Sequence, residues 1–238
     1  MFSNNFSKIN FQKLFPIFFF IICLTGCKNS ETTEKKSDTK TDTETSTINT
    51  SDKNIIFFGN SLTAAYGLED PTKGFVSLIQ QRIDSLKLPF HCVNAGLSGE
   101  TTAGGAERVD WIIAQQPFDI FMLELGGNDA LRGTPAATSE KNLQTIIDKV
   151  RDKNPKAKII LAGMEAPRNL GKIYTDAFHE IYPTLAKRNN ITLIPFILDK
   201  VGGVSGLNQP DGIHPNIAGN LIVRENIWSV VNSLLTQS

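Results

Sequence analysis

Residues 55–63 read IIFFGNSLT, an apolar run that stops at a glycine and continues into polar residues. Four apolar residues in succession are typical of a strand that is buried on both faces of a sheet. Such runs alternate along the chain with segments of helical periodicity, and they predict five strands, at residues 55–58, 90–95, 119–125, 158–162 and 192–196. Apolar strands that alternate with amphipathic helices predict an α/β fold with a parallel sheet covered on both faces.

The segments between the strands have apolar residues at helical spacing. The predicted helices lie around residues 75–86, 101–115, 143–150, 174–188 and 217–235. In open α/β sheets the active site lies at the carboxyl ends of the strands. The polar residues that follow the strands are therefore the candidates for a functional site.

Three of these strand ends carry polar or glycine residues. Ser61 lies in a tight turn after the first strand, and we expect it at the start of a helix, where the N-terminus favours developing negative charge. Gly99 follows the second strand in GLSGET, residues 96–101, and a glycine there lets backbone N–H groups approach a ligand closely. Asn128 follows the third strand in GGND, residues 126–129, which places its amide at the same edge.

A carboxylate and an imidazole lie close together near the C-terminus, where Asp211 stands three residues before His214 in the segment DGIHP. A serine becomes a nucleophile when a base takes its proton, and the base needs an orienting carboxylate. Ser61, His214 and Asp211 can fill these roles. An ester transition state also needs donors aimed at the developing oxyanion, and the N–H groups of Ser61 and Gly99 and the Asn128 side chain can supply three.

Four segments resemble the blocks that name the SGNH, or GDSL-type, hydrolases after Ser, Gly, Asn and His: GNSLT at 59–63, NAGLSGET at 94–101, LELGGND at 123–129 and DGIHP at 211–215. The resemblance spans about residues 54–232, and it is greatest to the branch of periplasmic acyl thioesterases, lysophospholipases and arylesterases. It implies a three-layer α/β/α, flavodoxin-like fold with a central five-stranded parallel sheet. It also implies that no cofactor is needed and that Ser61, Asp211 and His214 form a catalytic triad.

One residue departs from the family pattern, because Asn60 stands where the Gly-Asp-Ser-Leu block usually has Asp. An amide of the same shape still accepts hydrogen bonds from the N–H groups of the turn. The change removes one negative charge beside the nucleophile. We therefore expect it to alter the rate and the pH profile rather than the mechanism.

Residues around these segments are candidates for substrate binding. Leu131 and Arg132 closely follow the third strand and are expected to line the acyl pocket. The segment MEAP at 164–167 is either a loop that faces the substrate or a mere connection. Glu124 interrupts an apolar strand, which predicts either a partner near the site or a place at a sheet edge. His179 lies in a helical pattern and is interpreted as structural.

The N-terminal part of the chain has the features of a targeting segment. Residues 15–24 form an apolar stretch that is too short to span about 30 Å of hydrocarbon, which is typical of a signal peptide. The segment LTGC at 24–27 resembles the bacterial lipobox. It implies a lipoprotein signal peptide at residues 1–26 and lipid chains on Cys27, with an ordinary secretory signal or a stop-transfer anchor as the alternatives.

Residues 27–53 are almost entirely polar and cannot bury enough apolar surface to fold, so they predict a disordered tether. Residues 54–238 are the predicted hydrolase domain. The expected location is the cell envelope, with the protein anchored to the membrane as a periplasmic or outer-membrane lipoprotein.

The charge balance argues against nucleic acid as a partner, because Lys and Arg total 24, as do Asp and Glu, and no polybasic stripe is present. The three cysteines and three histidines show no zinc-type ligand spacing, so no metal site is predicted, and the family resemblance implies that no cofactor is needed. The expected partners are a small ester or lipid substrate and, through the lipid anchor, the membrane.

The preferred hypothesis is a serine esterase that hydrolyses aryl esters, short acyl esters or thioesters, or lysophospholipids through an acyl-enzyme. A carbohydrate O-deacetylase and a non-catalytic SGNH-like lipoprotein that binds an envelope component are the alternatives. The presence of Ser61, Asp211 and His214 together argues against the non-catalytic protein. The stretch at residues 126–133 favours the esterase branch over the deacetylases.

Overall fold

A computed structural model of the chain describes residues 53–236. The predicted signal peptide, Cys27 and the tether up to residue 52 lie outside the described residues. Lys53 is the first residue of a strand and not the end of the tether, because its N–H donates to the Pro89 carbonyl across 2.9 Å. Among the described helices, none combines the length and the apolar character that a membrane span needs.

The described residues form a five-stranded sheet in which every pair of neighbouring strands is parallel. The strands are β1 (Lys53–Gly59), β2 (Phe90–Gly96), β3 (Ile120–Glu124), β4 (Lys158–Ala162) and β5 (Thr192–Ile194), and their order across the sheet is β2-β1-β3-β4-β5. The central strands β1 and β3 are almost entirely buried, as their continuous apolar runs predict. The predicted five-stranded parallel sheet is confirmed.

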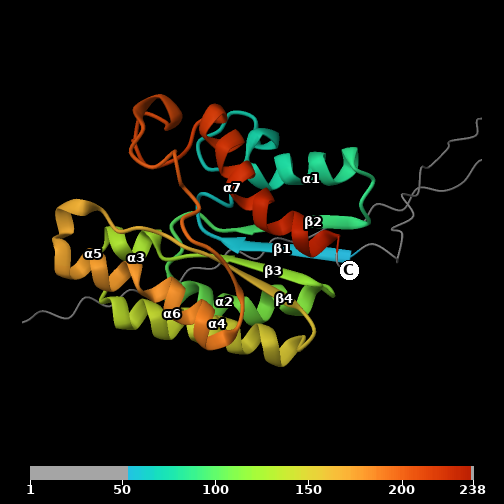
Figure 1. Cartoon of the computed structure of the whole chain (residues 1–238), viewed down its shortest axis with the longest axis horizontal. Coiled ribbons are helices and arrows are strands. Elements are labelled where there is room, and N and C mark those ends of the chain that lie inside the picture. Colours follow the sequence, from blue (N-terminus) through green and yellow to red (C-terminus); the bar gives the residue numbers. More distant parts are fainter. Residues whose placement is uncertain (1–52, 237–238) are drawn as a thin grey trace, which may run out of the picture. The chain divides into compact units, whose positions relative to one another are not determined.

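Helices cover both faces of this sheet and make the fold a three-layer α/β/α sandwich, as Figure 1 shows. On one face lie α1 (Phe75–Ser85) and α7 (Ile217–Leu235), which pack against each other. On the other face lie α2 (Thr102–Gln115), α4 (Ala136–Lys153) and α6 (Ile181–Asn189). The shorter helices are α3 (Gly127–Leu131) and α5 (Lys172–His179), and the single-turn 3-10 segments are Pro71–Lys73, Arg168–Leu170 and Ser205–Leu207.

The expectation that Ser61 opens a helix is wrong. Residues 61–67 form irregular turns, and the first α-helix after β1 begins at Phe75. Ala65 and Gly67 have φ angles of 56° and 75°, and backbone in this left-handed region cannot continue a right-handed helix. A helix dipole therefore plays no part at Ser61.

The single helix predicted for residues 174–188 is two helices, α5 and α6, which meet at Glu180. Pro183 explains the break. A proline has no N–H to donate, and its ring collides with the carbonyl four residues earlier, which belongs to His179 at the end of α5. Pro183 is tolerated because it lies in the first turn of α6, where the N–H groups have no partner within the helix.

Candidate active site

The register of the sheet brings the predicted site residues to one edge. Gly59 at the end of β1 is level with Gly96 of β2 and with Glu124 of β3. The segments that carry Ser61, Gly99 and Asn128 all begin just beyond this level. These three residues consequently line one cavity at the carboxyl end of the sheet.

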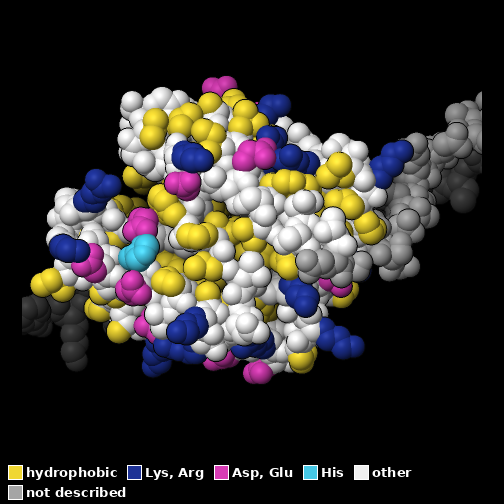
Figure 2. Space-filling model, viewed as in Figure 1, with side chains coloured by type: hydrophobic (Ala, Val, Ile, Leu, Met, Phe, Trp, Pro, Cys, Tyr) yellow, Lys and Arg dark blue, Asp and Glu magenta, His cyan; other side chains and the backbone are white. Residues whose placement is uncertain are grey.

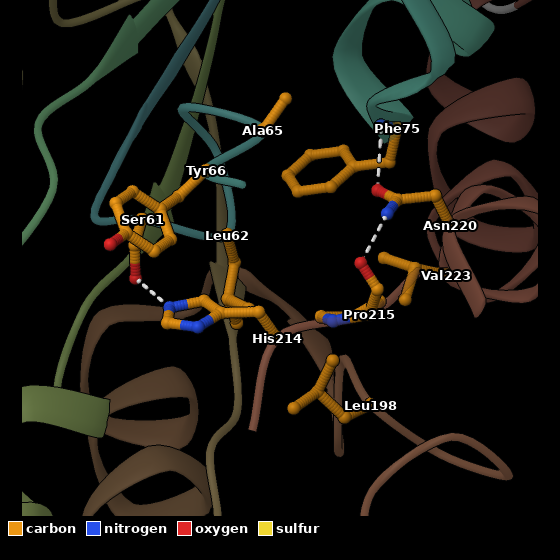
Figure 3. Close-up of a pocket in the computed structure, with 10 residues that line it drawn as sticks. All are labelled: Ser61, Leu62, Ala65, Tyr66, Phe75, Leu198, His214, Pro215, Asn220 and Val223. Atoms are coloured by element: carbon orange, nitrogen blue, oxygen red, sulfur yellow. Dashed lines mark hydrogen bonds between the residues drawn. The ribbon is translucent and has the colours of Figure 1, made fainter. Parts of the chain in front are cut away.

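Ser61, His214 and Asp211 form a continuous chain of hydrogen bonds. The Ser61 Oγ lies 2.8 Å from His214 Nε2, and His214 Nδ1 lies 2.7 Å from Asp211 Oδ2. Figure 3 shows the Ser61 hydroxyl and the His214 ring facing each other across this bond. The other Asp211 oxygen, Oδ1, accepts the backbone N–H groups of Ile213 and His214, both at 3.0 Å.

These contacts fix the ionisation of Asp211. Burial raises the pKa of its carboxyl, but the hydrogen bonds from His214 and Ile213 outweigh burial and lower the pKa to about 2. Asp211 is therefore a carboxylate at neutral pH and favours the tautomer with a proton on His214 Nδ1. In this tautomer Nε2 has a lone pair that can accept the Ser61 proton.

The donors expected at the oxyanion face the same cavity. Asn128, in the first turn of α3, donates one amide hydrogen to the Glu100 carbonyl across 3.0 Å, and its second amide hydrogen can serve the site. Gly99 has a φ of 81°, a backbone conformation that favours glycine, and it lies in open space. Arg132 does not line the cavity, since its guanidinium donates to the Gly99 carbonyl across 3.2 Å and so holds the Gly99 backbone.

The cavity beside Ser61 has a volume of about 1310 Å³. Part of its wall is apolar, with Leu131, Met164, Ala166, Pro167, Phe196 and Leu198. The segment 164–167 is thus a wall of the cavity and not a mere connection. Figure 2 shows hydrophobic side chains gathered over the middle of the visible face, with acidic and basic side chains interspersed around them.

His179, which the sequence analysis interprets as structural, lines the cavity. Its Nδ1 lies 2.7 Å from Glu165 Oε1, and both side chains are more than a third exposed. The pair joins α5 to the loop after β4. Sequence spacing alone carried no signal for it, since the two residues lie in different elements.

Glu124, the one charged residue in the apolar strand β3, is buried and has hydrogen-bond partners beside the site. Its side chain accepts hydrogen bonds from the nucleophile turn, including one from the Asn60 side chain, and it is only 1% exposed. Burial raises the pKa of Glu124 to about 7, although the hydrogen bonds from Thr63 and Asn60 act in the opposite direction. Within residues 53–236, no cluster of three or more His, Cys, Asp or Glu side chains could hold a metal ion.

The sequence match to known proteins agrees with this geometry. A model of the GDSL-like lipase/acylhydrolase family matches residues 57–222. The chain belongs to this family. The esterase TesA of Pseudomonas aeruginosa is 39% identical over 181 residues, which cover 76% of this chain and 89% of that protein. The arylesterase of Vibrio mimicus is 32% identical over 161 residues, covering 68% of this chain and 79% of that protein.

Solved structures of GDSL-like hydrolases have the same fold. The crystal structure of TesA superposes with a TM-score of 0.73 at 38% identity and covers 76% of this chain and 99% of that chain. The psychrotrophic esterase EstA from Pseudoalteromonas sp., described as inhibited by monoethylphosphonate, has a TM-score of 0.73 at 30% identity and covers 78% and 100%. As a member of this family, the chain is a carboxylic ester hydrolase with the SGNH fold.

Proposed function

We propose that this chain is a serine esterase that hydrolyses aryl esters, short acyl esters or thioesters, or lysophospholipids through an acyl-enzyme on Ser61. The hydrogen-bond chain from Ser61 to His214 to Asp211, at the wall of a partly apolar cavity, is the observation that carries the proposal. Relatives of this chain are named esterase, arylesterase and thioesterase 1/protease 1/lysophospholipase L1, which supports the same substrate classes.

In the acylation half-reaction, Ser61 Oγ attacks the ester carbonyl carbon while His214 Nε2 takes the hydroxyl proton. The carbonyl oxygen becomes an oxyanion that accepts hydrogen bonds from the N–H groups of Ser61 and Gly99 and from the Asn128 amide. The tetrahedral intermediate then breaks its bond to the alcohol or thiol, which leaves with the proton from His214. Asp211 stabilises the imidazolium and keeps the ring oriented throughout.

In the second half-reaction, His214 takes a proton from water, and the hydroxide oxygen attacks the acyl carbon on Ser61. Collapse of the second intermediate releases the carboxylic acid and returns the proton to Ser61. The apolar cavity wall suits the acyl chain of a substrate, because each methylene moved from water into such a site contributes about 0.8 kcal/mol. A carbohydrate O-deacetylase has no use for this wall, since its acyl group is an acetyl.

The decisive experiment compares Ser61→Ala with Ser229→Ala, a control on the exposed face of α7. Hydrolysis of p-nitrophenyl butyrate should fall on the order of 10³-fold or more in Ser61→Ala and stay unchanged in the control. A fluorophosphonate probe should label Ser61 alone. A Ser61→Ala enzyme with near-normal turnover would remove Ser61 as the nucleophile, and faster release of acetate from an acetylated glycan than of butyrate would favour the deacetylase.

For location, we propose that the protein is a cell-envelope lipoprotein anchored through Cys27. The LTGC segment and the polar residues that follow it support this proposal. A single acyl chain gives only marginal membrane binding, whereas two or three chains anchor a protein stably. The ester hydrolase domain would then act close to the lipid surface, where lysophospholipids are present.

A further inference from the structure

Glu124 lies in a position that an acidic residue rarely occupies. It is the last residue of the central strand β3, between two fully buried leucines, and its carboxylate reaches toward the neighbouring strand β1. Its register partner is Gly59, and a Cβ on Gly59 would lie 2.6 Å from Glu124 Oε2 and 2.2 Å from Thr63 Oγ1. The glycine therefore makes the room that this buried carboxylate occupies.

Three donors from the nucleophile turn converge on this carboxylate. Oε2 accepts from the Asn60 backbone N–H at 3.2 Å and from the Thr63 hydroxyl at 2.8 Å, and Oε1 accepts from Asn60 Nδ2 at 2.9 Å. The donors come from residues on both sides of Ser61. Glu124 thus fixes the turn at two points around the nucleophile without contacting the nucleophile itself.

The Asn60 side chain connects the Glu124 carboxylate to Ser61. While its Nδ2 donates to Glu124, its Oδ1 accepts the Leu62 backbone N–H at 3.0 Å and lies 3.4 Å from Ser61 Oγ. The orientation of the amide is settled by Leu62, because its backbone N–H can only donate and therefore faces the Asn60 oxygen. A rotated amide would lose both strong hydrogen bonds.

We propose that Asn60 and Glu124 are a positioning pair for the nucleophile. The Asn60 amide supplies the hydrogen that joins the pair, whereas two facing carboxyl groups would need a shared proton. This inference rests on the proposed function, since it assigns the pair to Ser61. With Asp at position 60, the residue that GDSL-type hydrolases usually carry there, two acceptor oxygens would face each other at about the 2.9 Å now spanned by the amide hydrogen bond. Two buried carboxylates at that distance must share a proton.

Other groups near Glu124 do not satisfy its carboxylate. Tyr182 of α6 donates its hydroxyl to the Leu125 carbonyl, and Asp129 of α3 accepts from Thr102, so both are engaged elsewhere. Thr63 is the partner that can reverse its role, because a hydroxyl either donates to a carboxylate or accepts from a protonated carboxyl. The pair in this chain consequently keeps its geometry in both ionisation states of Glu124.

The test is a polarity swap with three variants, Asn60→Asp, Glu124→Gln and the double variant. In Glu124→Gln, the new side-chain NH₂ group faces either the backbone N–H or the side-chain NH₂ of Asn60, depending on its orientation. Two donors then face each other, and one hydrogen bond is lost. We expect kcat on p-nitrophenyl butyrate to fall about 10- to 100-fold with KM within about twofold, since a displaced nucleophile weakens the chemical step. In the double variant, the glutamine now at position 124 donates to the aspartate now at position 60, and kcat should return to within about threefold of the wild type.

Asn60→Asp supplies a second measurement that does not depend on how well Glu124→Gln folds. The activity of this variant should fall more steeply at alkaline pH than that of the wild type. The reason is that the proton shared by Glu124 and the new aspartate is released there, and the two carboxylates then repel each other. The double variant, which has one carboxylate in the pair, should lack this additional loss.

Three outcomes would overturn the pairing. They are a Glu124→Gln enzyme with a lowered melting temperature but unchanged kcat, a double variant no better than the product of the single effects, and an Asn60→Asp profile that matches the wild type. Failure of the proposed function is distinguishable. It would appear as persistent turnover in Ser61→Ala, whatever the behaviour of the swap.

Discussion

Asn128→Ala removes two hydrogen bonds whose effects the structure separates. One amide hydrogen of Asn128 is donated to the Glu100 carbonyl across 3.0 Å in the resting enzyme. The other is expected to reach the oxyanion only when the tetrahedral intermediate forms. The first loss lowers the stability of the fold, and the second lowers the rate of the chemical step.

The two magnitudes differ widely. A neutral hydrogen bond to a backbone carbonyl contributes about 1 kcal/mol to stability, which corresponds to a shift of about 2–4 °C in the melting temperature of a domain of this size. Loss of one oxyanion donor costs about 10²–10³-fold in kcat, or roughly 3–4 kcal/mol of transition-state stabilisation. Because the donor acts in the transition state, kcat and kcat/KM should fall together and KM should stay nearly constant.

The assay pairs steady-state kinetics on p-nitrophenyl butyrate with a melting curve of the same preparation. Asn154→Ala is the matched control, because the Asn154 amide also donates to a backbone carbonyl, that of Phe118, at the opposite end of β3. Because Asn154 Oδ1 also accepts the Lys156 N–H at 3.1 Å, the control should melt at a temperature at least as reduced as that of Asn128→Ala, and it should keep its kcat. A raised KM with unchanged kcat, or a melting temperature far below that of the control, would refute the oxyanion role of Asn128.

Three further predictions concern stability, anchoring and substrate choice. The pKa of Glu124 is about 7 in the folded protein, against an ordinary value of 4.5, so the folded state holds this proton more tightly than the unfolded state does. The resulting stabilisation is complete below about pH 4.5 and is lost as pH rises through 7. Urea denaturation should show that the free energy of unfolding falls by roughly 3 kcal/mol between pH 4.5 and pH 8, and this fall should be absent from Glu124→Gln. Cys27→Ser should leave an unlipidated precursor that the lipoprotein signal peptidase does not cut, and a soluble wild-type protein with an unmodified N-terminus elsewhere would contradict the anchor. Leu131→Ala, in the cavity wall, should lower kcat/KM roughly tenfold for p-nitrophenyl decanoate and little for the acetate, and equal losses on both esters would contradict an acyl-binding role.

The sheet and the location of the site were predictable because their signals are local. A run such as residues 120–123 is long enough for a strand and too short for a helix, and its continuous apolar character identifies a central position. Because sites in such folds lie at the carboxyl ends of the strands, the sequence alone then predicts that Ser61, Gly99 and Asn128 lie at one edge of the sheet.

The departures from prediction depend on individual backbone conformations and on contacts between elements. Nothing in the sequence shows that Ala65 adopts a φ of 56°, yet this conformation is what keeps Ser61 out of a helix. The apolar surroundings of Glu124 indicated that it needs a partner, but its partners follow from the register that aligns it with Gly59. Arg132 was expected in the pocket because it follows Asn128 closely, whereas the direction of its side chain is decided by the Gly99 carbonyl.

The nucleophile and the base are held in different ways. Ser61 is anchored through Asn60 to the Glu124 carboxylate, which is 1% exposed at the end of the central strand β3. His214 lies on a loop beside Asp211, whose side chain is 38% exposed, and both of its ring nitrogens are hydrogen-bonded, Nδ1 to Asp211 and Nε2 to Ser61.

Gln209 joins these two parts of the site. Its side chain donates to the Tyr66 carbonyl at 2.8 Å and to the Pro215 carbonyl at 3.1 Å, and its backbone N–H donates to the His214 carbonyl at 2.7 Å. The Tyr66 ring lies 4.9 Å from the His214 ring. Because Tyr66 and Gln209 are 143 residues apart, the triad is aligned only after the C-terminal segment has docked on the nucleophile turn. Catalytic competence in this chain therefore requires the complete domain, although each catalytic residue lies in a short local motif.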